Sequence, residues 1–135
     1  METPTFFILI VADCTAGAPA LLDRVSRRAA RGPCDFTLLV PAREGSARGG
    51  RLAERTLRSA LAGLGRAAGR PVTGIVGPAG PLLAVRRTLE GDHFDEVIVS
   101  TLPRDRSRWL ARDLPRRIER DEVPVVVVES EPSGA

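Results

Sequence analysis

The side chains best suited to nucleophilic chemistry are few, and none has an evident base. Cys14, Thr15, Ser100 and Thr101 end or follow apolar runs of strand length. The only histidine, His93, precedes such a run. If the strands are parallel, as argued below, the imidazole lies at their amino ends, on the opposite edge of the sheet. A general base must reach the proton that it removes, so we expect a protein that is not an enzyme.

Metal and disulfide chemistry are not expected either. The chain has two cysteines, Cys14 and Cys34, and no CxxC or Cys/His ligand spacing. We therefore expect no metal and no cofactor. Cys14 follows the carboxyl end of the first predicted strand, whereas Cys34 precedes the second. Parallel strands would separate them by roughly 20 Å, beyond the limit of about 7 Å between the Cα atoms of a disulfide.

Arginine is the residue type most able to bind a ligand here, since all twenty basic residues are arginine. Residues 101–120 hold seven arginines and three acids, a local charge of +4 in a chain with a net charge of +3. Four of these arginines lie in the loop and first helical turn predicted after the fourth strand: Arg104, Arg106, Arg108 and Arg112.

Two interpretations of these arginines stay open. Their guanidinium forks suit phosphate or carboxylate, but they could equally form a solvated surface paired with Asp105 and Asp113. Trp109 is the only aromatic residue among them. We expect Trp109 to pack in the core, and without further aromatic residues to stack on bases, nucleic-acid binding is not expected.

The elements that must position these side chains follow from two alternating apolar patterns. Short continuous apolar runs predict strands covered on both faces, at 6–12, 36–40, 72–76, 95–100 and 125–128. Between them, apolar residues recur every three or four positions, which predicts helices around 21–29, 52–64, 82–89 and, last, ending near Asp121. A proline two residues after Asp113 predicts a helix break there, with Asp113 as the N-cap.

The order of elements predicts an α/β fold with a five-stranded, mostly parallel sheet and helices on both faces. A chain of 135 residues suits a single domain, 1–135, with a loop at 41–50 and a flexible tail at 130–135. The apolar run at 6–12 is much shorter than the roughly 18 residues of a membrane span. Acidic Glu2 precedes it, unlike the basic start of a signal peptide. We expect no membrane association and a cytoplasmic location.

Four segments resemble, in order and spacing, those of the universal stress protein family. They are ILIVADCT (8–15), FTLLV (36–40), IVGPAGPLL (75–83) and DEVIVS (95–100), the last followed by a Ser/Arg/Leu helix and PVVVV. The resemblance covers nearly the whole chain. It implies a three-layer α/β/α fold with strand order 3-2-1-4-5. Family members commonly pair through the last strand, which implies a homodimer through Val125, Val126, Val127 and Val128.

The resemblance and the residue types together define nine candidate ligand-binding residues: Asp13, Thr15, Val40, Gly77, Ser100, Thr101, Arg106, Arg112 and Asp113. Asp13 resembles the family residue near the adenine, although a capping carboxylate explains it as well. Gly77 allows either close backbone approach or a simple turn. Ser100 and Thr101 could bind a ligand or cap loop backbone.

One departure from the family bears on function. ATP-binding members carry G-x2-G-x9-G-[ST] after the fourth strand, where backbone N–H groups approach the phosphates. Aligned without gaps, these positions fall on Val99, Leu102, Arg112 and Asp113, so every glycine is absent. We therefore expect a non-catalytic regulatory or protein-association module that does not bind ATP in the usual way. The alternative is a binder of a small anionic ligand, such as a nucleotide, through the arginines.

Overall fold

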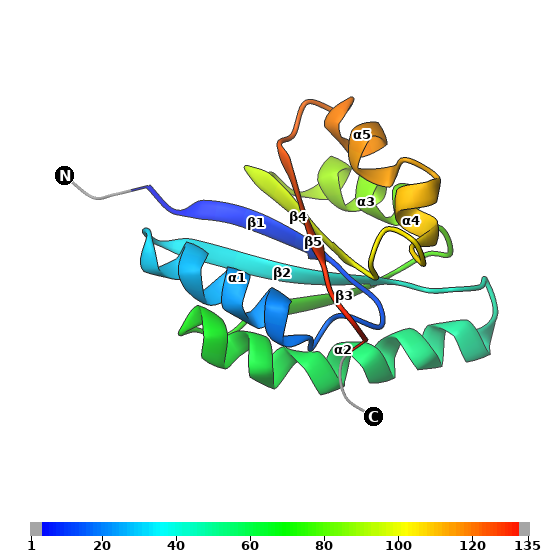
Figure 1. The fold of residues 1–135 in the computed structure, drawn as a ribbon, viewed down its shortest axis with the longest axis horizontal. Coiled ribbons are helices and arrows are strands. Elements are labelled where there is room, and N and C mark those ends of the chain that lie inside the picture. Colours follow the sequence, from blue (N-terminus) through cyan, green and yellow to red (C-terminus); the bar gives the residue numbers. More distant parts are fainter. Residues whose placement is uncertain (1–3, 133–135) are drawn as a thin grey trace.

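A single parallel sheet forms the centre of the molecule. The computed structural model describes residues 4–132. Its strands are β1 (Phe6–Val11), β2 (Cys34–Pro41), β3 (Thr73–Gly77), β4 (Glu96–Thr101) and β5 (Val125–Glu129). They lie in the order β3-β2-β1-β4-β5, and each neighbouring pair is parallel (Figure 1). The α/β class and the strand order expected from the sequence are confirmed.

Helices cover both faces of this sheet (Figure 1). One face carries α1 (Pro19–Ala30) and α2 (Ala47–Ala68). The other carries α3 (Pro81–Gly91), α4 (Arg108–Ala111) and α5 (Leu114–Glu119). None of the helices within residues 4–132 is long and apolar enough to cross a membrane.

The continuous apolar runs of the central strands are explained by two separate cores. Alternate residues of a strand point to opposite faces. Ile8 and Ile10 of β1 are therefore buried with the α1–α2 layer, and Leu9 and Val11 with the layer of α3 and α5. All four side chains are completely buried, so β1 has no polar position along its covered length.

The sequence predicted the start of α5 but not the start of α2. α2 begins at Ala47, inside the stretch predicted as a loop, because the Ser46 hydroxyl accepts a hydrogen bond from the Gly49 N–H at 3.1 Å and caps the helix. The helix break at Asp113 is confirmed, and its backbone is left-handed there, with φ of 61°.

The segment after β5 is tied to the rest of the molecule over its first residues. The Ser130 N–H donates to the Thr101 carbonyl at 2.9 Å, and Glu131 forms an ion pair with Arg106. These two residues lie in the predicted flexible tail, whereas 133–135 fall outside the described residues.

Candidate functional site

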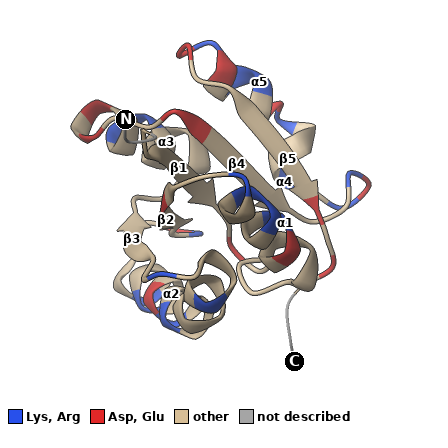
Figure 2. Ribbon diagram, turned by 90° about the vertical axis from the view of Figure 1, so that its left-hand side faces the viewer, with Lys and Arg blue, Asp and Glu red and all other residues tan. Residues whose placement is uncertain are grey.

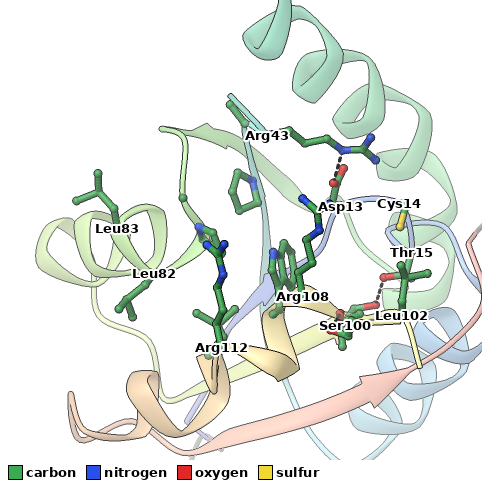
Figure 3. Close-up of a pocket in the computed structure, with 18 of the residues that line it drawn as sticks. Asp13, Cys14, Thr15, Arg43, Leu82, Leu83, Ser100, Leu102, Arg108 and Arg112 are labelled. Atoms are coloured by element: carbon green, nitrogen blue, oxygen red, sulfur yellow. Dashed lines mark hydrogen bonds and ion pairs between the residues drawn. The ribbon is translucent and has the colours of Figure 1, made fainter. Parts of the chain in front are cut away.

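A cleft of about 690 Å³ opens at the carboxyl ends of β1 and β4. These strands are neighbours although they are far apart in the sequence, so the strand order reverses between them. Segments after β1, β2 and β4, together with the start of α3, line the cleft (Figure 3). Open α/β sheets bind ligands at such a switch point, where loops from several strands converge.

Buried hydroxyl pairs form one side of the cleft. The Thr15 and Ser100 hydroxyl oxygens are 2.7 Å apart and join the segment after β1 to the end of β4 (Figure 3). Thr101 and Ser107 form a second pair at 2.7 Å, and Ser107 also accepts from the Leu110 N–H at the start of α4. Each hydroxyl has one hydrogen, so the mutual bond of Thr15 and Ser100 uses one of their two O–H groups.

Among residues 4–132, Asp13 is the only carboxylate that lines the cleft, and it is already paired. Asp13 accepts a hydrogen bond from Arg43 Nε at 2.7 Å (Figure 3), and this bond with the negative charge of Asp13 raises the pKa of Arg43. Burial, followed by the nearby charge of Asp13, raises the pKa of the Cys14 thiol. Cys14 is therefore protonated at neutral pH and a poor nucleophile.

Arginines dominate the charge of the cleft. Five line it: Arg43, Arg106, Arg108, Arg112 and Arg117. Arg43 is paired with Asp13 and Arg106 with Glu131. Among residues 4–132 the other three form no ion pair. Arg108 and Arg112 extend into the cleft from α4 and its C-cap (Figure 3). The cleft thus holds a surplus of positive charge available to an anion.

An apolar wall faces these arginines. Leu82 and Leu83 belong to the first turn of α3, and Leu83 is 46 % exposed. Leu102 and Trp109 contribute further apolar surface. Trp109 also packs against the core beneath α3 and α5, so it serves both the core and the cleft. Charged and apolar surfaces together suit a ligand with an anionic group and an apolar or aromatic body.

Six of the nine predicted site residues line the cleft: Asp13, Thr15, Ser100, Thr101, Arg106 and Arg112. Val40, Gly77 and Asp113 do not. Val40 is completely buried in the core beneath α1 and α2. A Cβ on Gly77 would lie 2.6 Å from Cβ of Ala84, so this glycine lets α3 pack closely against β3.

The predicted capping role of Asp113 is wrong in its detail. Asp113 is the N-cap residue of α5, but its side chain accepts no hydrogen bond from that helix. Its carboxylate lies 3.9 Å from Arg116 instead. Of the four arginines after β4, Arg106 pairs with Glu131, and none forms an ion pair with Asp105 or Asp113, the acids of the alternative interpretation. An N-cap residue that caps with its side chain typically has extended backbone, whereas Asp113 is left-handed, with φ of 61°.

Most of the residues that line the cleft were not among the predicted site residues; Arg43, Ser107, Leu82 and Arg117 are examples. Ser107 was detectable, since a serine three residues before Leu110 is a typical helix N-cap. Nothing local singles out Arg43, which lies near the amino end of α2 and reaches Asp13 across 30 residues of sequence.

Within the described residues, the cleft contains neither a histidine base nor a cluster of metal ligands, the groups on which hydrolytic sites commonly depend. His93 hydrogen-bonds to Asp95 at 2.8 Å, and Asp95 in turn accepts from the N–H of Phe7 near the start of β1. That end of the sheet is opposite the cleft. No cluster of three or more potential metal-ligating side chains occurs in residues 4–132. Neither cysteine forms a disulfide.

The sheet order and the cleft at its switch point define an α/β protein of the universal stress protein fold. A universal stress protein solved in complex with cAMP is similar, with a TM-score of 0.69 and 16 % identity over 96 % of this chain and 100 % of that chain. A universal stress protein from Archaeoglobus fulgidus, solved with dAMP, has a TM-score of 0.64 and 14 % identity over 93 % of this chain and 98 % of that chain.

The same fold recurs in a universal stress protein family structure from Burkholderia pseudomallei, with a TM-score of 0.60 and 14 % identity over 92 % of this chain and 96 % of that chain. No protein-family model matches the sequence. No curated protein matches it either. The resemblance inferred from the sequence motifs is confirmed at the level of the fold.

Proposed function

We propose that this protein is a divergent, non-catalytic universal stress protein whose cleft binds a small organic anion of the nucleoside monophosphate class. The observation that carries the proposal is the group formed by Arg108, Arg112 and Arg117, which line the cleft without an acidic partner among residues 4–132. We propose a regulatory role, because a protein that binds without catalysing acts through its bound state, and we keep the cytoplasmic location expected from the sequence as part of the proposal.

The wall opposite the arginines supports an anion as well. α3 opens onto the cleft at Gly80 and has no acidic residue in its first turn. A helix N-terminus carries a partial positive charge, so it adds to the field of the guanidinium groups. The exposed Leu83 and its neighbour Leu82 then offer an apolar surface to a base. The two solved neighbours described with cAMP and dAMP make a monophosphate the natural first probe.

Binding of ATP in the family's usual way is not part of this function. Val99 and Leu102 occupy positions that the family's motif assigns to glycine, and Val99 is completely buried within β4. A Cβ restricts φ and keeps backbone N–H groups away from phosphate oxygens. Arg112 occupies the third glycine position. It can hold a phosphate only through its side chain, which favours one phosphate over an extended triphosphate with Mg²⁺.

The lack of catalysis is supported by how the hydroxyls are used. Thr15 and Ser100 bond to each other, as do Thr101 and Ser107. Asp13, the only acid that lines the cleft within the described part of the chain, is paired with Arg43. A hydroxyl needs an adjacent base to become a nucleophile, and among residues 4–132 no histidine and no unpaired carboxylate lines the cleft.

Isothermal calorimetry with AMP, adenosine, inorganic phosphate and Mg-ATP tests the proposal. We expect AMP to bind more tightly than adenosine or phosphate alone, and Mg-ATP to show no advantage over AMP. Charge-assisted hydrogen bonds contribute about 1.5–3 kcal/mol, so Arg112→Gln and Arg108→Gln should each weaken AMP roughly ten- to a hundredfold. Arg87→Gln removes an exposed arginine of α3 that does not line the cleft, and should leave binding unchanged.

Two results would contradict the proposal. Equal affinity for adenosine and AMP would mean that the arginines do not hold the phosphate. Tight binding of Mg-ATP that survives both arginine substitutions would mean that a backbone cradle exists despite the missing glycines.

We also propose that the protein forms a homodimer through β5. This strand lies at one edge of the sheet, and Val127 at its centre is 37 % exposed. An exposed apolar edge strand can pair with another chain. Antiparallel pairing of two copies about a two-fold axis would satisfy both edges at once.

A further inference from the structure

The outer face of α2 carries a straight line of arginines, which we term the arginine ridge: Arg48, Arg51, Arg55, Arg58 and Arg66. All five side chains are exposed. An α-helix turns about 100° per residue, which places the five within an arc of about 80°. The buried residues Ala53, Ala60 and Leu64 lie on the opposite side of the helix. The ridge therefore points directly away from the core, and Figure 2 shows the arginine segments of α2 in blue.

Only part of this charge is offset within the described protein, because Glu54 lies three and four residues from Arg51 and Arg58. α2 contains one acid, Glu54, and among residues 4–132 no arginine of α2 forms an ion pair. Arg48, Arg51, Arg55 and Arg58 follow each other at three- or four-residue steps, the spacing at which like charges repel on a helix. Arg48 and Arg51 also lie in the first turns, where the helix dipole disfavours cations. Folding alone does not explain the ridge.

We propose that the arginine ridge binds the phosphate backbone of a nucleic-acid duplex, independently of sequence. Eighteen residue steps separate Arg48 from Arg66, or about 27 Å of helix. One turn of a duplex is about 34 Å long, so a ridge of this length spans most of a turn and can contact phosphates where the winding backbones meet it. The guanidinium fork matches phosphate oxygens in a bidentate arrangement.

An anionic membrane fits these observations less well. Helices that bind membranes in the interface insert an apolar face among the lipids. The apolar face of α2 is instead buried in the protein core, and Leu52 is the only large hydrophobic side chain of α2 with substantial exposure, at 39 %.

Single strands fit poorly too, because α2 carries no aromatic residue on which a base could stack. The sequence expectation against nucleic acids concerned residues 101–120 and base stacking. It does not address backbone contacts made by α2.

Fluorescence anisotropy with a labelled duplex of about 20 base pairs tests the proposal across a salt series. Contact with about five phosphates predicts a log K versus log salt slope of about −4.5. Arg51→Gln with Arg55→Gln should reduce the slope by about one per arginine. The same substitutions relieve repulsion between like charges, so the thermal midpoint should not fall. Arg87→Gln with Arg120→Gln removes the same charge from the opposite layer and should leave binding unchanged.

Three outcomes would overturn the proposal. If the protein does not bind the duplex at low salt, the proposal is wrong. Equal weakening by both double variants would show that net charge, not the ridge, attracts the duplex. Binding to vesicles of phosphatidylserine and phosphatidylcholine without binding to the duplex would assign the ridge to a membrane. Cleft variants such as Arg112→Gln should not affect duplex binding, so this result is independent of the cleft's ligand.

Discussion

The hydroxyl pair of Thr15 and Ser100 should behave as one energetic unit. Their oxygens are 2.7 Å apart, and the two residues are 1 % and 0 % exposed. Thr15→Val keeps the shape of the side chain but leaves the Ser100 hydroxyl buried without its partner. Ser100→Ala leaves Thr15 in the same state. An unsatisfied buried hydroxyl costs about 1–3 kcal/mol, so we expect each single variant to lose about 2 kcal/mol of unfolding free energy.

The double variant, Thr15→Val with Ser100→Ala, tests whether the two hydroxyls act as a unit. With both hydroxyls removed, neither group is left unsatisfied, and an apolar pair of similar shape can be nearly neutral. We therefore expect the double variant to lose far less than the sum of the two single losses, about 4 kcal/mol, with a coupling energy of about 2–3 kcal/mol. Urea unfolding measures this, since a loss of about 2 kcal/mol lowers the midpoint by roughly 1 M when m is about 2 kcal/mol/M.

Additive losses, agreeing within about 0.5 kcal/mol, would refute the reasoning. They would mean that each hydroxyl is satisfied separately, for example by water in the cleft, and that the segment after β1 is not held to β4 by this bond. A change in the slope m would instead signal an altered folded or unfolded state, and the comparison would then be repeated with Thr15→Ala.

Three further predictions follow from packing, thiol chemistry and the sheet edge. Gly77→Ala should lose about 1–3 kcal/mol of stability through overpacking, because the new methyl group would lie 2.6 Å from Ala84; an unchanged denaturation midpoint would contradict this. Thiol titration under denaturing, non-reducing conditions should count two thiols, and AMP should slow alkylation of Cys14 in the cleft more than that of buried Cys34. Val127→Lys should shift sedimentation at micromolar concentration from dimer to monomer without unfolding the chain, because Val127 is exposed; a monomeric wild type would exclude the β5 dimer.

The architecture was predictable because its signals are local. Each strand contains a short apolar run, and proline or glycine lies in most of the connections. Such signals survive in a chain that has only 16 % identity to a solved protein of similar fold. The α2 start was mispredicted since glycine and serine in 41–50 suggest a loop, whereas the Ser46 cap and the packing of the long helix override their weak helix propensity.

The site was only partly predictable because it is assembled from distant segments. Ser100 and Thr101 could be placed at the cleft, because they end β4 and the carboxyl ends of parallel strands lie at the same edge of the sheet. Val40 could not be excluded, because the face on which a strand residue points depends on register. Arg43 was missed because its partner, Asp13, meets it only through the pairing of β1 and β2.

The end of β5 and the segment after it contact the loop after β4, which contributes residues to the cleft. Glu129 ends β5 and its carboxylate accepts from the Arg104 N–H at 2.6 Å, while Glu131 holds Arg106, which lines the cleft. Hydrogen bonding to Arg106 lowers the pKa of Glu131. An anion that recruits Arg106 competes with Glu131 for the same guanidinium group. The two equilibria are therefore coupled, and the coupling is reciprocal. If binding of an anion shifts the ordering equilibrium of the segment after β5 by some factor, then ordering of that segment changes the affinity for the anion by the same factor.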